Sequence, residues 1–335
     1  MISTSRDTVN ERLLGDWQRD FPLVPRPFRH IASALDLSEA DVIERLKALQ
    51  NAGAIDRVGG VVRPNTIAAS TLAAMAVPDF EVDAVAALLS AEPGVNHVYL
   101  RENDWNLWFV MTGPDRSYVD AALYRIAECA GYPVLDLSLE TPYFIDLGFA
   151  LTGAETNKPR YPSGDQGPGD RHLPEPEDRA LVQKLTSGLP LQPEPFRMLG
   201  SDLGMTEADV LDRLRALTAS SIVPRIGIIV RHRAVGWRAN AMVTWDVPPS
   251  DVDRAGEILA RASGVNLCYR RRRHEQAWPY NLYCMVHAKT REDALEKIGD
   301  AQDLARLSSF PRQILFSLRC FKQTGALVSL PKEAA

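Results

Sequence analysis

The sequence has no long apolar run and no excess of positive charge. None of its 335 residues belongs to a stretch approaching the roughly 18 consecutive apolar residues that a membrane span needs. The N-terminal stretch MISTSRDTVNERLLGDWQRD is polar, so we expect a cytoplasmic protein without a membrane segment. The net charge of −5 argues against nucleic acid as the main partner, because phosphate contacts need clustered basic residues.

Cysteine is also scarce, and the common cofactor motifs are missing. The four cysteines, Cys129, Cys268, Cys284 and Cys320, form no close pair, so we expect reduced, buried thiols. The sequence contains neither a glycine-rich phosphate loop nor a cluster of metal-binding residues. It therefore predicts no bound nucleotide cofactor and no intrinsic metal.

What the sequence does have is an internal repeat. Residues 21–49, FPLVPRPFRHIASALDLSEADVIERLKAL, match residues 189–217, LPLQPEPFRMLGSDLGMTEADVLDRLRAL. The match continues from IDRVGGVVRP to VPRIGIIVRH, then from VNHVYLR and NLWFVM to VNLCYRR and NLYCMV. The chain is therefore a fused tandem duplication.

Each copy combines a helical part with an α+β part. Ser38 with Asp41, and Thr206 with Asp209, predict capping boxes at the second helix of a helix-turn-helix, and GAIDRVGGVVRP predicts a two-stranded wing. The following pattern predicts strands at 71–77, 95–101, 105–111 and 133–139 and helices at 82–90 and 117–130. This βαββαβ order is the ferredoxin-like plait.

The predicted fold class is therefore α+β, a tandem duplication of winged helix-turn-helix plus ferredoxin-like units. This layout resembles that of the Lrp/AsnC regulators, whose plaits pair face to face, and we expect a pseudo-dimer within one chain. The predicted domains are residues 1–67 (winged helix-turn-helix), 68–153 (ferredoxin-like), 154–178 (linker rich in Pro, Gly and charge), 179–236 (winged helix-turn-helix) and 237–330 (ferredoxin-like).

The layout raises the alternative of a DNA-binding transcription regulator, one that could sense a tetrapyrrole. A recognition helix presents its first residues to DNA. Here those residues are acidic: Glu39, Asp41 and Glu44 in the first copy, and Glu207, Asp209 and Asp212 in the second. They suit the helix dipole but oppose a phosphate backbone. Arg45, Lys47, Arg213 and Arg215 lie further along and could compensate in part.

Residues 93–110, PGVNHVYLRENDWNLWFV, predict a hairpin with two unlike faces. With the turn at residues 103–104, one face collects His97, Tyr99, Arg101, Asn106 and Trp108. The opposite face is apolar and suits packing beneath the two helices. A plait has helices on only one side of its sheet, so the polar and aromatic face needs a partner sheet, a ligand, or both.

The second copy repeats this face with differences. Tyr269 and Arg271 share a face with Asn281 of the next strand, but Leu267 replaces His97. Conversely, His232 stands where the first copy has Pro64. We interpret this as two pseudo-equivalent sites that have diverged in their acid–base group. A plain protein interface is the alternative, because aromatic residues and arginine are enriched there.

At this point the sequence resembles a known family. VNHVYLRENDWNLWFV resembles the HNYxRExxxNLWF signature of the siroheme decarboxylases, and VPRIGIIVRHRAVGWRANAMVTWDVP and LCYRRRRHEQAWPYNLYCMVH are similar to the signatures of the partner subunit. The arrangement is that of the fused NirDL type. The resemblance implies a carboxy-lyase of haem d1 biosynthesis, which converts siroheme to 12,18-didecarboxysiroheme and releases two acetate carboxylates as CO2. It implies no separate cofactor, because the substrate carries the iron.

The candidate residues follow from this resemblance and from the two faces. The catalytic candidates are His97, His232, Tyr99 and Tyr269, with the substrate iron near His97 or His232. The substrate-binding candidates are Arg101, Asn106, Trp108, Arg231, Arg270, Arg271, Arg272, Arg273, His274, Trp278 and Asn281. The expected partners are siroheme and its product, a second copy of the chain, and other haem d1 biosynthesis proteins, but neither DNA nor a membrane.

Two positions depart from the family signature. Asn103 stands where family members often have a second histidine, and Val98 stands where they usually have asparagine. We expect Val98 to face the helices, which makes its change structural. Asn103 raises the hypothesis that the first half has lost catalysis.

Overall fold

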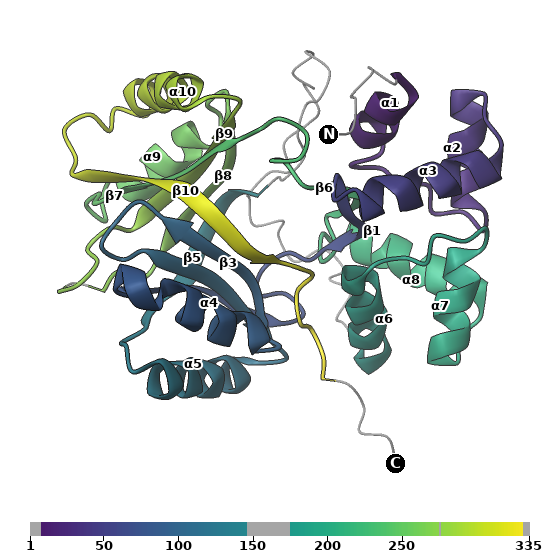
Figure 1. Ribbon diagram of the computed structural model, residues 1–335, viewed down its shortest axis with the longest axis horizontal. Coiled ribbons are helices and arrows are strands. Elements are labelled where there is room, and N and C mark those ends of the chain that lie inside the picture. Colours follow the sequence, from purple (N-terminus) through teal and green to yellow (C-terminus); the bar gives the residue numbers. More distant parts are fainter. Residues whose placement is uncertain (1–7, 146–174, 275, 331–335) are drawn as a thin grey trace.

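The computed structural model describes residues 8–145, 175–274 and 276–330. Figure 1 shows two lobes, one that gathers the helix-turn-helix parts of both copies and one that gathers both plaits. Strands β1 (Ile55–Val61) and β6 (Arg225–Val230) lie between the two lobes. The duplication therefore pairs like with like rather than stacking one complete copy beside the other.

The helical lobe contains three helices from each copy and one shared core. The helices are α1 (Thr8–Asp16), α2 (Pro27–Leu35), α3 (Glu39–Asn51), α6 (Pro176–Ser187), α7 (Pro195–Leu203) and α8 (Glu207–Ala219). Both predicted capping boxes are present, at Ser38–Asp41 and Thr206–Asp209. Phe28 and Phe196, fully buried at equivalent positions of the repeat, belong to the same core. Each helix-turn-helix thus completes the core of the other.

The predicted wing is wrong in one respect. Each copy contributes a single strand, and β1 pairs antiparallel with β6 of the other copy. Gly59 and Gly60 lie inside β1, where a side chain on either would collide with Leu185 of α6. A strand that pairs across the repeat satisfies its own edge, so neither copy needs a hairpin there.

Both plaits have the predicted βαββαβ order. The first comprises β2 (Ala69–Met75), α4 (Val82–Ala91), β3 (Val95–Arg101), β4 (Leu107–Gly113), α5 (Arg116–Ala130) and β5 (Leu135–Ile145), with a short 3-10 turn at Asp79–Glu81. The second comprises β7 (Ala239–Trp245), α9 (Val252–Leu259), β8 (Val265–Arg271), β9 (Leu282–Ala288), α10 (Arg291–Leu304) and β10 (Arg312–Gln323).

The two sheets close into one barrel in the order β10-β3-β4-β2-β5-β8-β9-β7. Closure depends on β5, which pairs with β2 of its own plait and then with β8 of the other, and on β10, which joins β7 to β3 in the same way. The pseudo-dimer within one chain is thereby confirmed. The outer face of each sheet meets the other around Trp108, Tyr283 and Leu315, which are fully buried.

The linker predicted at 154–178 lies largely outside the described residues. Within the described part, Glu175 caps α6 and residues 176–178 form its first turn, so that boundary shifts to the helix start. Among the described residues, no helix is long and apolar enough to cross a membrane.

All four cysteines are free thiols. Cys268 and Cys284 are buried as predicted, Cys320 is half-buried, and Cys129 is exposed on the outer face of α5, so the prediction of burial is wrong for Cys129. The described residues contain no group of three or more His, Cys, Asp or Glu side chains placed to hold a metal ion.

Candidate functional site

The hairpin forms with the predicted register. Tyr99 is paired with Trp108, and the Arg101 N–H donates to the carbonyl of Asn106. Val98 and Phe109 belong to the core beneath the helices of the first plait, whereas Trp108 belongs to the core between the sheets. The row of His97, Tyr99 and Arg101 therefore faces the other half of the molecule, and Val98 is structural, as expected.

Across from this row lies a cluster from the second copy. His232 and Arg233 follow β6, and His287 lies on β9. The His232 and His287 rings meet edge to face with centroids 4.8 Å apart, and His97 stacks on Tyr99 at 6.3 Å. Arg101 connects the two groups, because its Nη1 donates to Asn240 Oδ1 at 3.1 Å and Asn240 Nδ2 donates to His287 Nε2 at 2.7 Å.

We call the group formed by His97, Tyr99, Arg101, His232, Arg233 and His287 the histidine site. It brings together His97 of the first copy and His232 of the second. The physical reason is the barrel: strand pairing across the copies sets β3 against the segment that follows β6.

The histidines of this site are neutral at pH 7. Burial, with the nearby charge of Arg57, lowers the pKa of His97 to about 4, and burial, with the charges of Arg233 and Arg101, lowers the pKa of His232 to about 4. Burial also lowers the pKa of His287 well below its usual value. The pKa of about 6.5 that a histidine has in water therefore does not apply to His97 or His232.

His97 also has a defined tautomer. Its Nδ1 lies 2.8 Å from Asn96 Oδ1, and an amide oxygen can only accept a hydrogen bond. In the neutral ring Nδ1 therefore carries the hydrogen, and Nε2 keeps a lone pair that can take a proton or bind a metal.

Two arginines supply the positive charge. Arg101, 5% exposed, donates from Nη1 to Asn240 Oδ1 and to the Leu315 carbonyl, both at 3.1 Å. Arg233 donates from Nη2 to the Ser317 carbonyl at 2.6 Å. Burial lowers the pKa of Arg101 to about 10, so it stays charged at neutral pH.

The two predicted tyrosines have different surroundings. Burial, reinforced by Cys320, raises the pKa of Tyr99, which therefore remains a neutral phenol able to donate a hydrogen bond. Tyr269 is buried and stacks on Tyr283 with centroids 5.7 Å apart, and Arg271 lies 4.4 Å above its ring. Tyr269 acts electrostatically on Arg101, so it lies near the histidine site as well.

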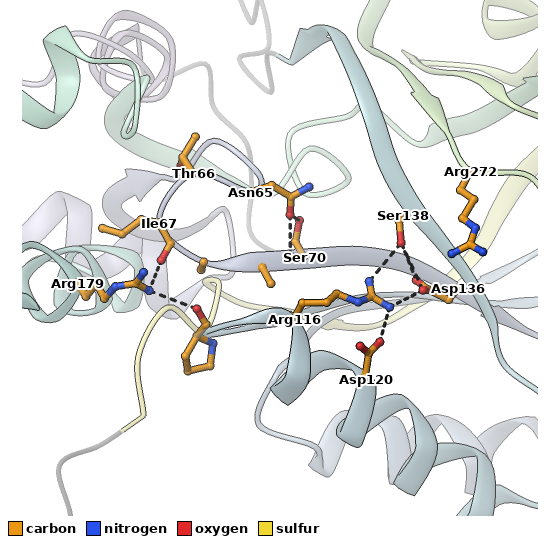
Figure 2. Close-up of a pocket in the computed structure, with 13 residues that line it drawn as sticks. Asn65, Thr66, Ile67, Ser70, Arg116, Asp120, Asp136, Ser138, Arg179 and Arg272 are labelled. Atoms are coloured by element: carbon orange, nitrogen blue, oxygen red, sulfur yellow. Dashed lines mark hydrogen bonds and ion pairs between the residues drawn. The ribbon is translucent and has the colours of Figure 1, made fainter. Parts of the chain in front are cut away.

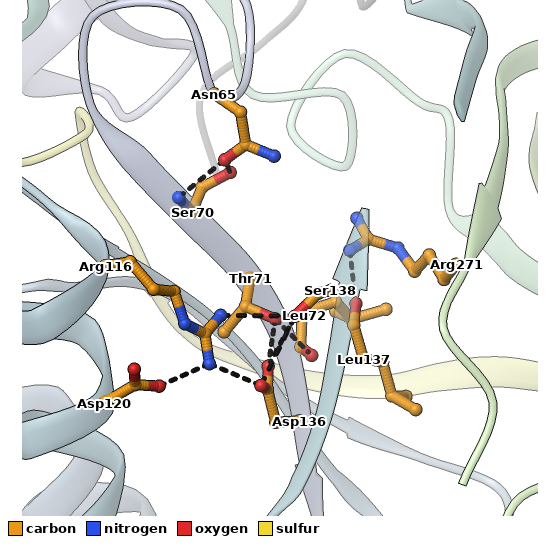
Figure 3. Close-up of polar contacts among 10 residues, drawn as sticks. All are labelled: Asn65, Ser70, Thr71, Leu72, Arg116, Asp120, Asp136, Leu137, Ser138 and Arg271. Carbon is orange, nitrogen blue, oxygen red and sulfur yellow. Dashed lines mark hydrogen bonds and ion pairs between the residues drawn. The ribbon is translucent and has the colours of Figure 1, made fainter. Parts of the chain in front are cut away.

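The pseudo-equivalent half has lost the histidines. Leu267, Pro64 and Thr112 stand at the positions of His97, His232 and His287, as the repeat and the β4 and β9 registers show. Arg271 keeps the contact of its counterpart, donating to the Leu137 carbonyl at 2.7 Å (Figure 3).

A cavity of about 700 Å³ opens on that side, and no histidine lines it (Figure 2). Its cations include Arg116, which binds Asp120 and Asp136, and Arg179, which donates to the carbonyls of Ile67 and Pro114. Arg272 also lines it. The cavity is polar, but neither histidine nor cysteine is among the residues that line it.

The four arginines of the loop at residues 270–273 differ in their partners within the protein. Arg270 is paired with Glu140 and Asp253, and Arg273 with Asp246. Of the four arginines, Arg272 alone has no hydrogen bond or ion pair from its side chain to another described residue. All four arginines line a second cavity of about 650 Å³, together with Asn281 and exposed His274. Arginine side chains that lie this close to carboxylates form ion pairs within the protein.

Four other predicted substrate contacts are occupied structurally. The side-chain amides of Asn106 and Asn281 each bind both backbone groups of one residue, Val77 and Val247 respectively. Trp108 Nε1 donates to the Trp105 carbonyl, and Trp278 Nε1 donates to the Tyr283 hydroxyl. These side chains hold strands and the inter-sheet core in place, so their geometry does not support substrate contact.

Two further predicted positions lie at the edge of the site or outside it. Arg231 forms an ion pair with Asp56 at 3.1 Å. Asn103, which replaces the second histidine of the family signature, accepts a hydrogen bond from the Trp105 N–H and thereby shapes the hairpin turn.

Sequence reasoning missed Arg233, His287 and Asn240. His287 aligns with Thr112 within the matched segments NLYCMVH and NLWFVMT, so a comparison of the copies at every polar position would have found it. Arg233 lies next to a predicted histidine, in a segment where the second copy is longer than the first.

Fold and site together define a tandem Lrp/AsnC-like protein with a buried histidine and arginine site between its two halves. Comparisons with known proteins agree. The family model for the AsnC-like ligand binding domain matches residues 67–139 and 234–322, and that for the siroheme decarboxylase NirDL-like HTH domain matches residues 10–55 and 178–223. The siroheme decarboxylase NirDL subunits of Paracoccus pantotrophus and Paracoccus denitrificans are 49% and 48% identical, over 96% of this chain and 98% of each relative.

Solved structures agree as well. Two crystal structures of siroheme decarboxylase NirDL, one in co-complex with an iron-uroporphyrin III analogue, match with a TM-score of 0.64. They are 25% and 26% identical, and the match covers 96% of this chain and 94% of each structure's chain. The chain belongs to the siroheme decarboxylase NirDL family.

Proposed function

We propose that the protein is a siroheme decarboxylase, a carboxy-lyase that converts siroheme to 12,18-didecarboxysiroheme in haem d1 biosynthesis. Family membership along nearly the whole chain supports the reaction. One observation supports the location of the site: hydrogen bonds join Arg101 through Asn240 to His287, whose ring contacts His232, and His97 stacks on Tyr99 in the same row as Arg101. Siroheme brings its own iron, so the proposal includes no further cofactor.

In this reaction the protein has two roles: it binds the substrate and it supplies a proton. In each step the bond between an acetate methylene and its carboxylate breaks and carbon dioxide leaves. The electron pair is delocalised into the conjugated macrocycle, and a proton delivered to the methylene carbon completes a methyl group. We assign carboxylate binding to buried Arg101 and half-buried Arg233, because a guanidinium shielded from water forms strong charge-assisted hydrogen bonds.

We assign the proton to His97 or His232. Both are neutral in the free protein, and a polycarboxylate that enters the site adds negative charge beside them, which raises the pKa of each ring. Substrate binding and histidine protonation are therefore coupled. The histidine that stays neutral can bind the substrate iron through its unprotonated ring nitrogen. Tyr99, a neutral phenol, can orient a carboxylate.

Anaerobic incubation of the purified protein with siroheme, followed by mass spectrometry, tests the activity. The expected result is stepwise loss of two carbon dioxide units. The activity would be refuted if the absorption spectrum shows that reduced siroheme is bound but its mass is unchanged after prolonged incubation.

A DNA-binding regulator is the second candidate, and the helix surface disfavours it. The basic residues that could offset the acidic recognition helices have partners within the protein: Arg45 binds Asn10, Lys47 binds Glu44, and Arg213 binds Glu175 and Asp178. Arg215 is paired with Asp212. The helix-turn-helix parts then serve as scaffold, with their shared core holding the strands that precede Arg233.

Partners and location complete the proposal. We infer that the chain binds siroheme and its decarboxylated product, works in the cytoplasm, and associates there with a second copy or with other haem d1 biosynthesis proteins. Relatives named NirD, NirL and NirH subunits exist as separate chains, which supports association between such modules. Here the fusion already supplies one such pairing.

A further inference from the structure

Arg101 and Arg271, at equivalent positions of the repeat, are held differently. Each donates from Nη1 to a strand carbonyl, Arg101 to Leu315 at 3.1 Å and Arg271 to Leu137 at 2.7 Å (Figure 3). Arg101 has a second acceptor, Asn240 Oδ1, at 3.1 Å. Ser70 occupies the position of Asn240 in the first copy, and it has no hydrogen bond to Arg271 among the described residues.

A buried chain of side chains fixes the second acceptor. Asn240 Nδ2 donates to His287 Nε2 at 2.7 Å, and His287 Nδ1 donates to Asn266 Oδ1 at 3.0 Å. Asn240 and His287 are each 3% exposed. Because an amide nitrogen can only donate and an amide oxygen can only accept, these bonds require the neutral His287 tautomer with hydrogen on Nδ1. They also turn the amide of Asn240 so that its oxygen faces Arg101.

We propose that Asn266, His287 and Asn240 are positioning residues that orient the Arg101 guanidinium for a substrate carboxylate. The inference rests on the proposed function, because the carboxylate belongs to siroheme. Arg101 Nε is buried and has no partner among the described residues. With Nη1 fixed, the guanidinium is held in one orientation, and a preorganised donor binds more tightly than one that must be ordered first.

The other half shows what is missing without this chain. Thr112 takes the place of His287, and its hydroxyl binds the Gly94 carbonyl and the Asn96 amide instead. Arg271 is left with one carbonyl and the ring of Tyr269. We call Asn266, His287 and Asn240 the relay. The relay is a second difference between the histidine site and the equivalent site of the other half, in addition to the loss of the acid–base group there.

The first copy of the repeat suggests which substitutions to test in the second copy. Asn240→Ser and His287→Thr each introduce the residue that the first copy uses at that position. Each should weaken siroheme binding, measured by anaerobic titration of the Soret band, roughly tenfold, the loss of one charge-assisted hydrogen bond. The double variant should bind no more weakly than either single variant, because both break one relay. In an Arg101→Met background neither change should weaken binding further.

Ser70→Ala is the matched control and should bind siroheme as the wild type does. Three results would overturn the relay. The first is wild-type affinity for siroheme in either single variant, the second is an additive loss of affinity in the double variant, and the third is a loss of affinity that persists in the Arg101→Met background. A wild-type protein that binds no siroheme would instead refute the proposed function. For Asn240→Ser, KM should rise more than kcat falls, whereas a misfolded variant would lose active protein and lower kcat.

A measurement without substrate tests the geometry by itself. In protein labelled with ¹⁵N-histidine, the ring resonances lost in His287→Thr should identify a neutral imidazole with hydrogen on Nδ1. Hydrogen on Nε2, or a charged ring at pH 7, would contradict the hydrogen-bond directions on which the relay depends.

Discussion

At the scale of residues, one site holds the groups that can move a proton and the other does not. His97, His232 and His287 face one another across the two copies, whereas Leu267, Pro64 and Thr112 stand at the equivalent positions. An imidazole in a buried, cationic site is neutral until an anion arrives. In the proposed mechanism, the substrate's carboxylates therefore supply the negative charge that allows a histidine of this site to take up a proton.

Replacing His97 with leucine, the residue at the equivalent position of the second copy, tests whether only the histidine site is active. We expect His97→Leu to lower the decarboxylation rate on the order of 10²-fold or more, the usual effect of removing an acid–base group or iron ligand. Leu267→Ala, on the pseudo-equivalent strand, should keep the wild-type rate. Rates of mass loss from siroheme decide between them, and equal loss in both variants would argue against a single active site.

The buried histidines also predict how stability depends on pH. The pKa of His232 is about 4 in the folded protein and near 6.5 when unfolded, so protons bind the unfolded chain more strongly. Its contribution is complete above pH 6.5 and is lost as the pH falls toward 4, on the order of 3 kcal/mol. Urea unfolding of His232→Gln between pH 7 and 4 should show a shallower decline than the wild type. Parallel curves would disprove the lowered pKa.

At the scale of elements, the molecule depends on two strands that leave their own plait. Strand β5 continues past the length that its pattern predicts, and its Tyr143 packs on α9 of the second plait, where the hydroxyl donates to Asp253. Gly256 in α9 makes room for that ring. The alternation of apolar residues located both β5 and β10, but the second half of each strand pairs with a sheet that local pattern cannot specify.

Substitutions at two glycines in helices of the second plait distinguish the effect of the Tyr143 contact on stability from the effect of helix propensity. We expect Gly256→Ala to destabilise the protein by about 1–3 kcal/mol, because the added carbon would overlap the Tyr143 ring. Gly299→Ala in α10, where nothing lies within 4 Å of the added carbon, should stabilise it by about 0.5–1 kcal/mol. Chemical denaturation measures both, and stabilisation by Gly256→Ala would rule out the close packing.

At the scale of the whole molecule, the repeat allowed the fold to be predicted almost completely. The helix caps, the plait order and the pairing of the copies all follow from local pattern and duplication. The site was predicted in part: His97, Tyr99, Arg101 and His232 belong to it, but their meeting at one place depends on strand pairing between residues far apart in sequence. The ion pairs of the arginine loop could not be predicted, because its acidic partners, Glu140, Asp246 and Asp253, lie on other segments.

The arrangement of charge also predicts weak DNA binding. The basic side chains of α3 and α8 have acidic or amide partners, so few remain to displace counterions from a phosphate backbone. Gel-shift titration at low salt should show at most weak, sequence-independent binding. A specific complex with a steep salt dependence would favour a regulator.

The most direct test compares the wild type with the His97→Ala, His232→Ala double variant in one anaerobic siroheme assay read by mass spectrometry. The account predicts loss of two carbon dioxide units by the wild type and, from the folded double variant, unchanged siroheme over the same time. A double variant that decarboxylates at the wild-type rate would contradict it.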